Sequence, residues 1–133
     1  MKLYQKLAQM QDAYHRCIDR GNSKWKLNHE EAIRKLVADN MPKGSGFDNG
    51  TQFDFERKDC LIFSTAFHHM NDDGYYDGWS EHKVAVTPSL AFEINVRVTG
   101  IDRNGIKEYI AEVFRADLTK EIETVLPFAI AIP

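Results

Sequence analysis

The stretch AFEINVRVTG at residues 91–100 decides the fold, because its side chains alternate without interruption between apolar and polar. The apolar set is Phe92, Ile94, Val96 and Val98, and the polar set is Glu93, Asn95, Arg97 and Thr99. Successive side chains of a strand point to opposite faces of a sheet, so this pattern predicts a strand with one apolar and one polar face.

Three more strands are predicted upstream of this one. TQFDF at 51–55 alternates, CLIFSTAFHHM at 60–70 is rich in aromatic and β-branched residues, and WSEHKVAVT at 79–87 is closed by Pro88. The turn-forming residues of NDDGYYDG at 71–78 separate the second strand from the third. Short connections of this kind predict an antiparallel sheet of three to four strands within residues 51–100.

Helices are predicted on both sides of the sheet in the sequence. Apolar residues at helical spacing predict a helical hairpin over residues 1–41, broken near Gly21 and ended by Pro42. The segment RNGIKEYIAEVFRADL predicts a C-terminal helix over 102–120 with Asp102 as its N-cap, followed by an apolar tail at 121–133. We therefore expect a single α+β domain in which helices cover one face of the sheet.

Composition narrows the class of protein. The chain has 133 residues, a net charge of −3 and a pI near 5.9, which argue against binding to nucleic acid polymers. It has no apolar run long enough to span a membrane, and its first residues lack the uniform apolar stretch of a signal peptide. We expect an intracellular protein whose two cysteines, Cys17 and Cys60, stay reduced.

The best-placed cations follow the last predicted strand. Arg97 lies on its polar face, while Arg103, Asn104 and Lys107 fall at the start of the predicted C-terminal helix. A helix N-terminus favours anions, so these residues predict a binding site for a phosphate or pyrophosphate. The alternative interpretation is solvated surface charge.

Two other segments are candidate parts of a ligand site. The glycine-rich KGSGFDNGT at 43–51, with Ser45 and Phe47, is either an anion-binding loop or a connector that needs glycine for its turns. The aromatic turn GYYDGW at 74–79 supplies Tyr75, Tyr76 and Trp79, which suit stacking on a ligand, together with Phe92, or burial at a subunit interface. The alternative is that the three turn aromatics fold back to cover the end of the sheet.

A metal-dependent hydrolase is the enzymatic alternative, with His68 or His69, His82 and Asp77 as ligands. Adjacent strand residues point to opposite faces, so His68 and His69 do not readily share one ion. The sequence contains no metalloprotease, nucleophile-elbow or P-loop motif. We therefore expect no catalytic residues, no metal and no cofactor.

Three segments, GSGFDNGT, FSTAFHHMNDDGYYDGWSEHKVAVTPSL and GIDRNGIKEYIAEVF, resemble a family of phage proteins. These are the first-described Thoeris anti-defence sponges, and the resemblance covers residues 3–118. It implies tight binding of glycocyclic ADP-ribose without cleavage, in the cytoplasm of the infected bacterium. It also implies, in some members, binding of cyclic di- or trinucleotides at a separate site, and homo-oligomers with pockets between protomers and no metal. The tail after residue 121 departs from the family pattern.

The remaining alternative is a protein-interaction module that inhibits a host enzyme through the aromatic turn. The exposed aromatics, the apolar tail and the helical hairpin also predict, by themselves, a homo-oligomer.

Overall fold

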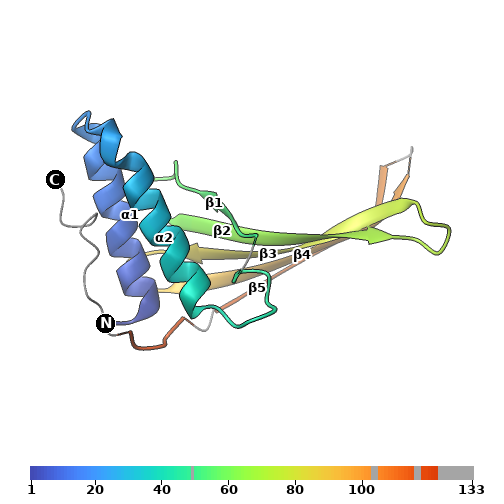
Figure 1. The fold of residues 1–133 in the computed structure, drawn as a ribbon. Coiled ribbons are helices and arrows are strands. Elements are labelled where there is room, and N and C mark those ends of the chain that lie inside the picture. The colour runs from blue at the N-terminus through green and yellow to red at the C-terminus, as the bar shows by residue number, and fades with distance from the viewer. Residues whose placement is uncertain (49, 103–104, 116–117, 123–133) are drawn as a thin grey trace.

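The computed structural model describes residues 1–48, 50–102, 105–115 and 118–122. Two helices lie against a five-stranded antiparallel sheet, so the α+β class is confirmed (Figure 1). The helices are α1 (Leu3–Asp19) and α2 (Lys26–Asn40), joined by a short 3₁₀ turn, η1 (Ser23–Trp25). The strands are β1 (Gln52–Asp54), β2 (Leu61–Met70), β3 (Tyr76–Val86), β4 (Ala91–Asp102) and β5 (Gly105–Arg115).

The predicted helical hairpin is confirmed. Gly21 has a φ of 73°, the left-handed conformation that ends a helix at low cost for glycine. Leu3, Leu7, Met10 and Tyr14 form one buried stripe of α1 that packs with Ile33 and Val37 of α2 in the hydrophobic core. No helix within the described residues is long and apolar enough to cross a membrane.

The predicted C-terminal helix over 102–120 is wrong, because most of this segment is strand β5. Asp102 pairs with Gly105, whose φ is 115°, so the chain turns back here as a β-hairpin instead of starting a helix. Asn-Gly before a run of β-branched and aromatic residues is a hairpin signal, and β4 offers a full-length edge with which to pair. Pairing along that edge outweighs the helical spacing of the apolar residues.

The strands lie in the sheet in the same order as in the sequence, each antiparallel to its predecessor. Directly paired residues share a face, so the register assigns every side chain of β2 to β4 to one side or the other. Phe63 pairs with Phe53 of β1 and Val84 of β3, and all three belong to the face that packs on the helices. We call this the helix face, and the opposite side the bare face.

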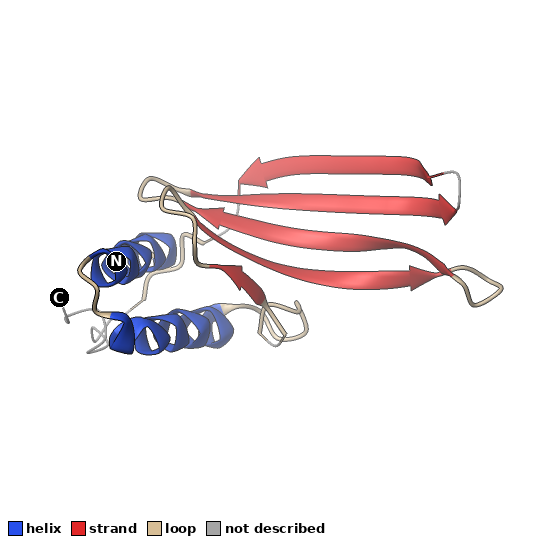
Figure 2. Cartoon of the chain, turned by 90° about the horizontal axis from the view of Figure 1, so that it is seen from above, coloured by secondary structure: helices blue, strands red, loops and turns tan. Residues whose placement is uncertain are grey.

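The helices cover only one end of the helix face. At this covered end, the sheet contributes five core residues: Leu61, Phe63, Val84, Val86 and Ala91. From the row formed by Phe67, Ser80, Arg97 and Ile110 onward, the strands form an outer end. This end extends past both helices (Figures 1 and 2). The prediction that helices cover one face is therefore right for the covered end alone.

β4, the strand with alternating apolar and polar residues, turns its polar side chains toward the side of the helices. Ala91 of β4 pairs with Val86 on the helix face, so Phe92 and the apolar residues at alternate positions after it lie on the bare face. The polar set, which includes Asn95 and Arg97, lies on the same side as the helices. This arrangement decides which predicted site residues can act together.

Candidate functional site

The helix N-terminus predicted to bind a phosphate is replaced by strand β5 (Gly105–Arg115). Lys107 lies within strand β5, and Arg103 and Asn104 are outside the described residues. Without a helix at this position, neither a helix dipole nor free first-turn N–H groups contribute to anion binding. Of the four predicted residues, Arg97 alone remains in a position that the structure describes in full.

Arg97 lines a hollow of about 280 Å³ on the helix face, just beyond the helices. Its walls are side chains of three adjacent strands, among them Ser80 and His82 of β3, Asn95 of β4 and Glu112 of β5. Asn95 pairs with His82 and with Glu112, while Arg97 pairs with Ser80, so two neighbouring rows of the sheet form the floor. Four hydrogen-bonding side chains and the permanently charged guanidinium of Arg97 thus face the same hollow.

The hydrogen-bonding capacity of this floor is incompletely used. The Oδ1 atom of Asn95 is buried and has no hydrogen-bond partner within the described structure. Arg97 is exposed and forms no ion pair with any described residue. Phe67 pairs with Ser80 in the same row, and 48% of its surface is exposed. A guanidinium, an unsatisfied amide and an open aromatic ring are therefore available to a ligand.

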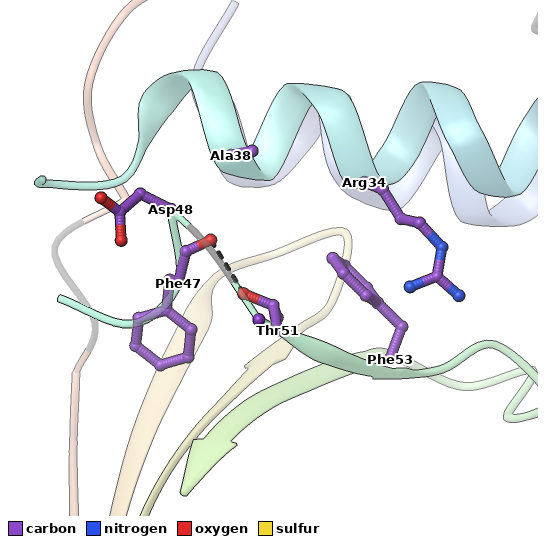
Figure 3. Close-up of a pocket in the computed structure, with 7 residues that line it drawn as sticks. Arg34, Ala38, Phe47, Asp48, Thr51 and Phe53 are labelled. Carbon is purple, nitrogen blue, oxygen red and sulfur yellow. Dashed lines mark hydrogen bonds between the residues drawn. The ribbon is translucent and has the colours of Figure 1, made fainter. Parts of the chain in front are cut away.

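A second hollow, of about 250 Å³, lies between α2 and the glycine-rich loop (Figure 3). The Arg34 guanidinium extends from α2 beside Phe53 and lies 5.1 Å from the ring centroids of both Phe53 and Phe55. Those two rings stack with centroids 5.1 Å apart. Asp48 lies at the other end of this hollow (Figure 3), so this hollow, like the first, contains one arginine and one carboxylate.

The glycine-rich loop is a packed connector. A Cβ on Gly46 would lie 2.6 Å from Oγ1 of Thr65, so glycine is required for the loop to sit on the sheet. Phe47 is buried against Phe63, and the Thr51 hydroxyl donates to the Phe47 carbonyl at 2.8 Å.

The polar groups of the loop also bond within it. The Ser45 hydroxyl donates to the carbonyl of Pro42 at 2.6 Å, and the Gly44 N–H donates to the Asp48 carboxylate at 2.9 Å. The Phe47 ring is thus packed into the protein, and the Ser45 hydroxyl is used in a hydrogen bond within the loop.

The predicted aromatics do not gather around Arg97. Trp79 and Phe92 lie on the bare face, opposite Arg97. Tyr75 lies in the β2–β3 turn and is 73% exposed, and Tyr76 contacts the His68 ring at 5.5 Å. The predicted ligand set is therefore divided among the two faces of the sheet, the turn and the loop.

The histidines follow the register of β2 and β3. His68 pairs with Trp79 on the bare face, whereas His69 pairs with Gly78 on the helix face. This confirms that the two side chains diverge. His69 Nε2 and the Ser80 hydroxyl oxygen lie 2.7 Å apart, a local hydrogen bond. No group of three His, Cys, Asp or Glu side chains among the described residues could hold a metal ion.

Two buried bases in the helical hairpin have unpartnered nitrogen atoms. Lys6 and His29 are almost fully inaccessible, and neither Lys6 Nζ nor His29 Nε2 has a hydrogen-bond partner in the described structure. Burial lowers the pKa of both side chains from their ordinary values, because desolvation penalises the charged forms.

Sequence reasoning identified Arg97 and missed most of its neighbours. Asn95 belongs to the polar set of the same alternating strand, which was a usable signal for it. Ser80 and His82 also fall on this face through the period of β3, but only the pairing register aligns them with Arg97. Nothing in the sequence marks Arg34. Comparisons with family models, curated proteins and solved structures returned no match.

Proposed function

We propose that this protein binds and sequesters a small cyclic nucleotide, with the Arg97 hollow as the ligand site. The observation that carries the proposal is the exposed Arg97 guanidinium, unpaired within the described structure, beside the unsatisfied Asn95 amide oxygen. A buried polar atom without a partner is unusual, and a ligand donor at this position would satisfy it.

Each part of a nucleotide has a suitable group on this floor. Arg97 is a bidentate donor for phosphate oxygens, and Ser80 and His82 offer additional polar atoms on the neighbouring strand. Phe67 does not line the hollow, but it lies in the same row beyond Ser80 and offers an open ring on which a base can stack. Asn95 Oδ1 and Glu112 accept hydrogen bonds from the amino group of a base or from a ribose hydroxyl. Sequestration needs only these contacts and no nucleophile.

The biological role follows from the resemblance to the Thoeris anti-defence sponges. The protein would act as a homo-oligomer in the cytoplasm of an infected bacterium and remove glycocyclic ADP-ribose or a related cyclic nucleotide from immune signalling. What supports this role is the combination of the quoted motifs with an open hollow that contains one unpaired arginine. The ligand site proposed here lies on the surface of one protomer, whereas the resemblance implies pockets between protomers.

The site is tested by calorimetric titration of glycocyclic ADP-ribose and a panel of cyclic nucleotides. A charge-assisted hydrogen bond to phosphate contributes roughly 1.5–3 kcal/mol, so Arg97→Ala should weaken binding about ten-fold or more with the circular dichroism spectrum unchanged. Lys58→Ala is the matched control, because Lys58 is an exposed cation that pairs with Asp19 at 3.2 Å, outside the hollow.

Arg34→Ala separates the two hollows. It should bind like the parent protein if the ligand lies at Arg97, and it should be the weakened variant if the ligand lies between α2 and the loop. A parent protein that binds none of the nucleotides would contradict the proposed function.

The enzymatic alternative gives a different result with the same material. After incubation with a nucleotide that binds, the protein is denatured and the released ligand is analysed by mass spectrometry. A sequestering protein returns the intact nucleotide, whereas a phosphodiesterase returns a hydrolysed product.

An interaction module is the second candidate, favoured by the β2–β3 hairpin at the tip of the outer end. Met70, Tyr75 and Tyr76 are all exposed there. The turn itself is well ordered, since Asn71 Oδ1 accepts hydrogen bonds from the N–H groups of Asp73 and Tyr75, both at 3.0 Å. Tyrosines on a rigid turn are effective protein-binding groups. In this case, replacing Tyr75 would abolish inhibition of a host enzyme, and titration with nucleotides would show no binding.

A further inference from the structure

Ser80 lies between two different side chains on the helix face of the outer end. On one side, its hydroxyl oxygen lies 2.7 Å from Nε2 of His69, which belongs to β2. On the other side, Ser80 is the direct strand partner of Arg97 on β4. Because β2, β3 and β4 are consecutive strands of the sheet, the hydroxyl has an imidazole on one flank and a guanidinium on the other.

The two flanks of Ser80 differ in their access to the Arg97 hollow. Ser80 and Arg97 both line this hollow, whereas His69 does not. A molecule in the hollow would therefore meet the hydroxyl from the side of β4, with the imidazole behind it. Ser80 and His69 are both half-buried, so their hydrogen bond is partly shielded from water.

A serine hydroxyl that hydrogen-bonds to an imidazole is the arrangement that activates serine as a nucleophile. In the tautomer protonated at Nδ1, His69 Nε2 can accept the hydroxyl proton, so attack on a carbonyl carbon needs no free alkoxide. A guanidinium on the opposite flank lies on the side where negative charge develops on the carbonyl oxygen. The two residues of the hydrogen bond are brought together by the pairing of β2 with β3, and for this reason no local sequence motif marks them.

We infer that Ser80 is an activated nucleophile that hydrolyses small carboxylic esters, with His69 as the general base and Arg97 as the group that stabilises the oxyanion. The Ser80 oxygen attacks the ester carbonyl carbon, its proton moves to His69 Nε2, and the carbonyl π electrons move to the oxygen beside Arg97. The bond to the alcohol oxygen then breaks, and the alcohol leaves with the proton from His69. Water attacks the acylated serine while His69 takes one of its protons, and return of that proton to the serine oxygen releases the carboxylic acid.

The hollow suits a small, uncharged acyl group. Its volume is about 280 Å³, and Ile110, which is 41% exposed, adds an apolar side chain beside Arg97 in the same row. A phosphodiester is a poorer substrate for these groups, because it is already anionic and the described lining of the hollow contains one permanent cation. Ester hydrolysis is therefore an activity beyond the proposed sequestration, and it is compatible with the recovery of intact nucleotide.

The probe is p-nitrophenyl acetate, supplied without any nucleotide. The parent protein should release p-nitrophenolate faster than buffer alone, and peptide mapping by mass spectrometry should locate the acetyl group on Ser80. Ser80→Ala should remove both signals. His69→Gln keeps a hydrogen-bonding side chain but no base, so it should slow the acetylation of Ser80 by about 100-fold or more.

Two matched controls change the same residue types on the bare face. Ser64 and His68 both belong to β2, where they pair with Lys83 and Trp79 on the side of the sheet opposite the hollow. Ser64→Ala and His68→Gln should therefore leave the rate of p-nitrophenolate release unchanged. Circular dichroism verifies that each variant folds, and peptide mapping of the parent protein identifies the acetylated residue without any variant.

Three results would overturn the inference. The first is acetylation of lysine or histidine side chains with Ser80 unmodified, and the second is a Ser80→Ala variant that cleaves the ester at the parent rate. The third is a His69→Gln variant in which Ser80 is acetylated as fast as in the parent protein.

Arg97→Ala tests the third group of the mechanism. Loss of one oxyanion-stabilising donor should slow the acetylation of Ser80 by about 100-fold, and an unchanged rate would contradict the role of Arg97. None of these measurements involves a nucleotide, so their failure would leave the calorimetric test of the proposed function unaffected.

Discussion

Phe63 and Phe67 lie on the same strand and on the same face of the sheet, yet they have opposite environments. Phe63 is completely buried in the core beneath the helices, whereas Phe67, four residues further along β2, is 48% exposed. The backbone pairing of the two residues is equivalent, since each has a direct partner on β3. The covered end and the outer end therefore differ in what lies above the strands, and not in the strands themselves.

This difference separates stability from binding. At the covered end, apolar side chains of the sheet, α1 and α2 pack into one core that supplies most of the free energy of folding. At the outer end the backbone hydrogen bonds persist, but the side chains face solvent and are available to ligands or partners. Four sets of substitutions probe the boundary, in decreasing order of expected effect.

Removing the two phenylalanine rings gives the largest contrast. Phe63→Ala should lower the free energy of unfolding by about 3–5 kcal/mol, because it leaves a cavity in a closed core. Phe67→Ala should lower it by about 1 kcal/mol or less, because half of that ring is already hydrated. Urea denaturation of both variants measures the difference, and equal losses would show that the outer end is covered in solution.

The outer end also contains one position that tolerates no side chain. A Cβ on Gly78 would lie 2.0 Å from the carbonyl oxygen of Val98, and its φ is 139°. Gly78→Ala should therefore cost about 2–4 kcal/mol. Gly74→Ala, in the nearby turn, meets no atom within 4 Å and should cost about 1 kcal/mol for its positive φ alone. Thermal unfolding compares them; similar melting temperatures would argue against the close approach of β3 and β4.

Lowering the pH should destabilise the protein through His29 at the covered end. Burial lowers its pKa below the ordinary 6.5, so the unfolded chain binds a proton more readily than the folded protein. Stability should therefore fall as the pH drops below about 6.5, by at most about 1.4 kcal/mol per pH unit. His29→Leu should flatten this dependence, and His68→Leu at the outer end serves as the control.

The pKa values of two carboxylates, Asp59 and Glu121, lie below this pH window. A hydrogen bond from Arg57 lowers the pKa of Asp59 below 3.8, and a hydrogen bond from the N-terminal ammonium lowers that of Glu121 below 4.5. Their protonation accompanies acidification below the range in which His29 acts. Urea titrations between pH 5 and 7.5 thus isolate the histidine, and an unchanged slope in His29→Leu would exclude it as the cause.

The smallest effect is expected at Arg34, at the edge of the covered end. Its guanidinium lies over Phe53 and Phe55, an arrangement that contributes about 0.5–1 kcal/mol at exposed sites. Arg34→Ala should lose that amount, and Arg34→Lys should keep part of it, because an ammonium is also attracted to the ring face. A stability for Arg34→Ala equal to that of the parent protein would show that the contact adds nothing.

The sequence was sufficient to predict the elements in which apolar residues recur with an unambiguous period. The helical hairpin and the four strands between residues 51 and 100 were predictable, because apolar spacing of 3.6 or 2 recurs over their lengths. β5 was not predicted, since the spacing of Ile106, Tyr109 and Ile110 suits a helix and Asp102 was interpreted as its N-cap. Tertiary pairing with β4 decided the outcome, and spacing along one segment contains no information about it.

The site was predictable only in part, for a related reason. Alternation placed Asn95 and Arg97 on one face of β4, but it did not reveal that this face is shared with the helices. The helices pack on the face that carries Ala91 and Val86 at the covered end, because these small and branched side chains close the core. The division of the predicted aromatics from Arg97 follows from that choice.

The sheet order has a consequence for how quickly the molecule forms. Every strand pairs with its predecessor in the chain, so β2 to β5 assemble by successive hairpins without closing a long loop. Such local pairing gives a low contact order for a β-rich protein, and low contact order accompanies fast folding. Docking of α1 onto β2 and β3 joins segments more than forty residues apart, so we expect it to be the slower step. We therefore expect hairpin growth to precede that docking, with backbone hydrogen bonds of the outer end forming before the core closes.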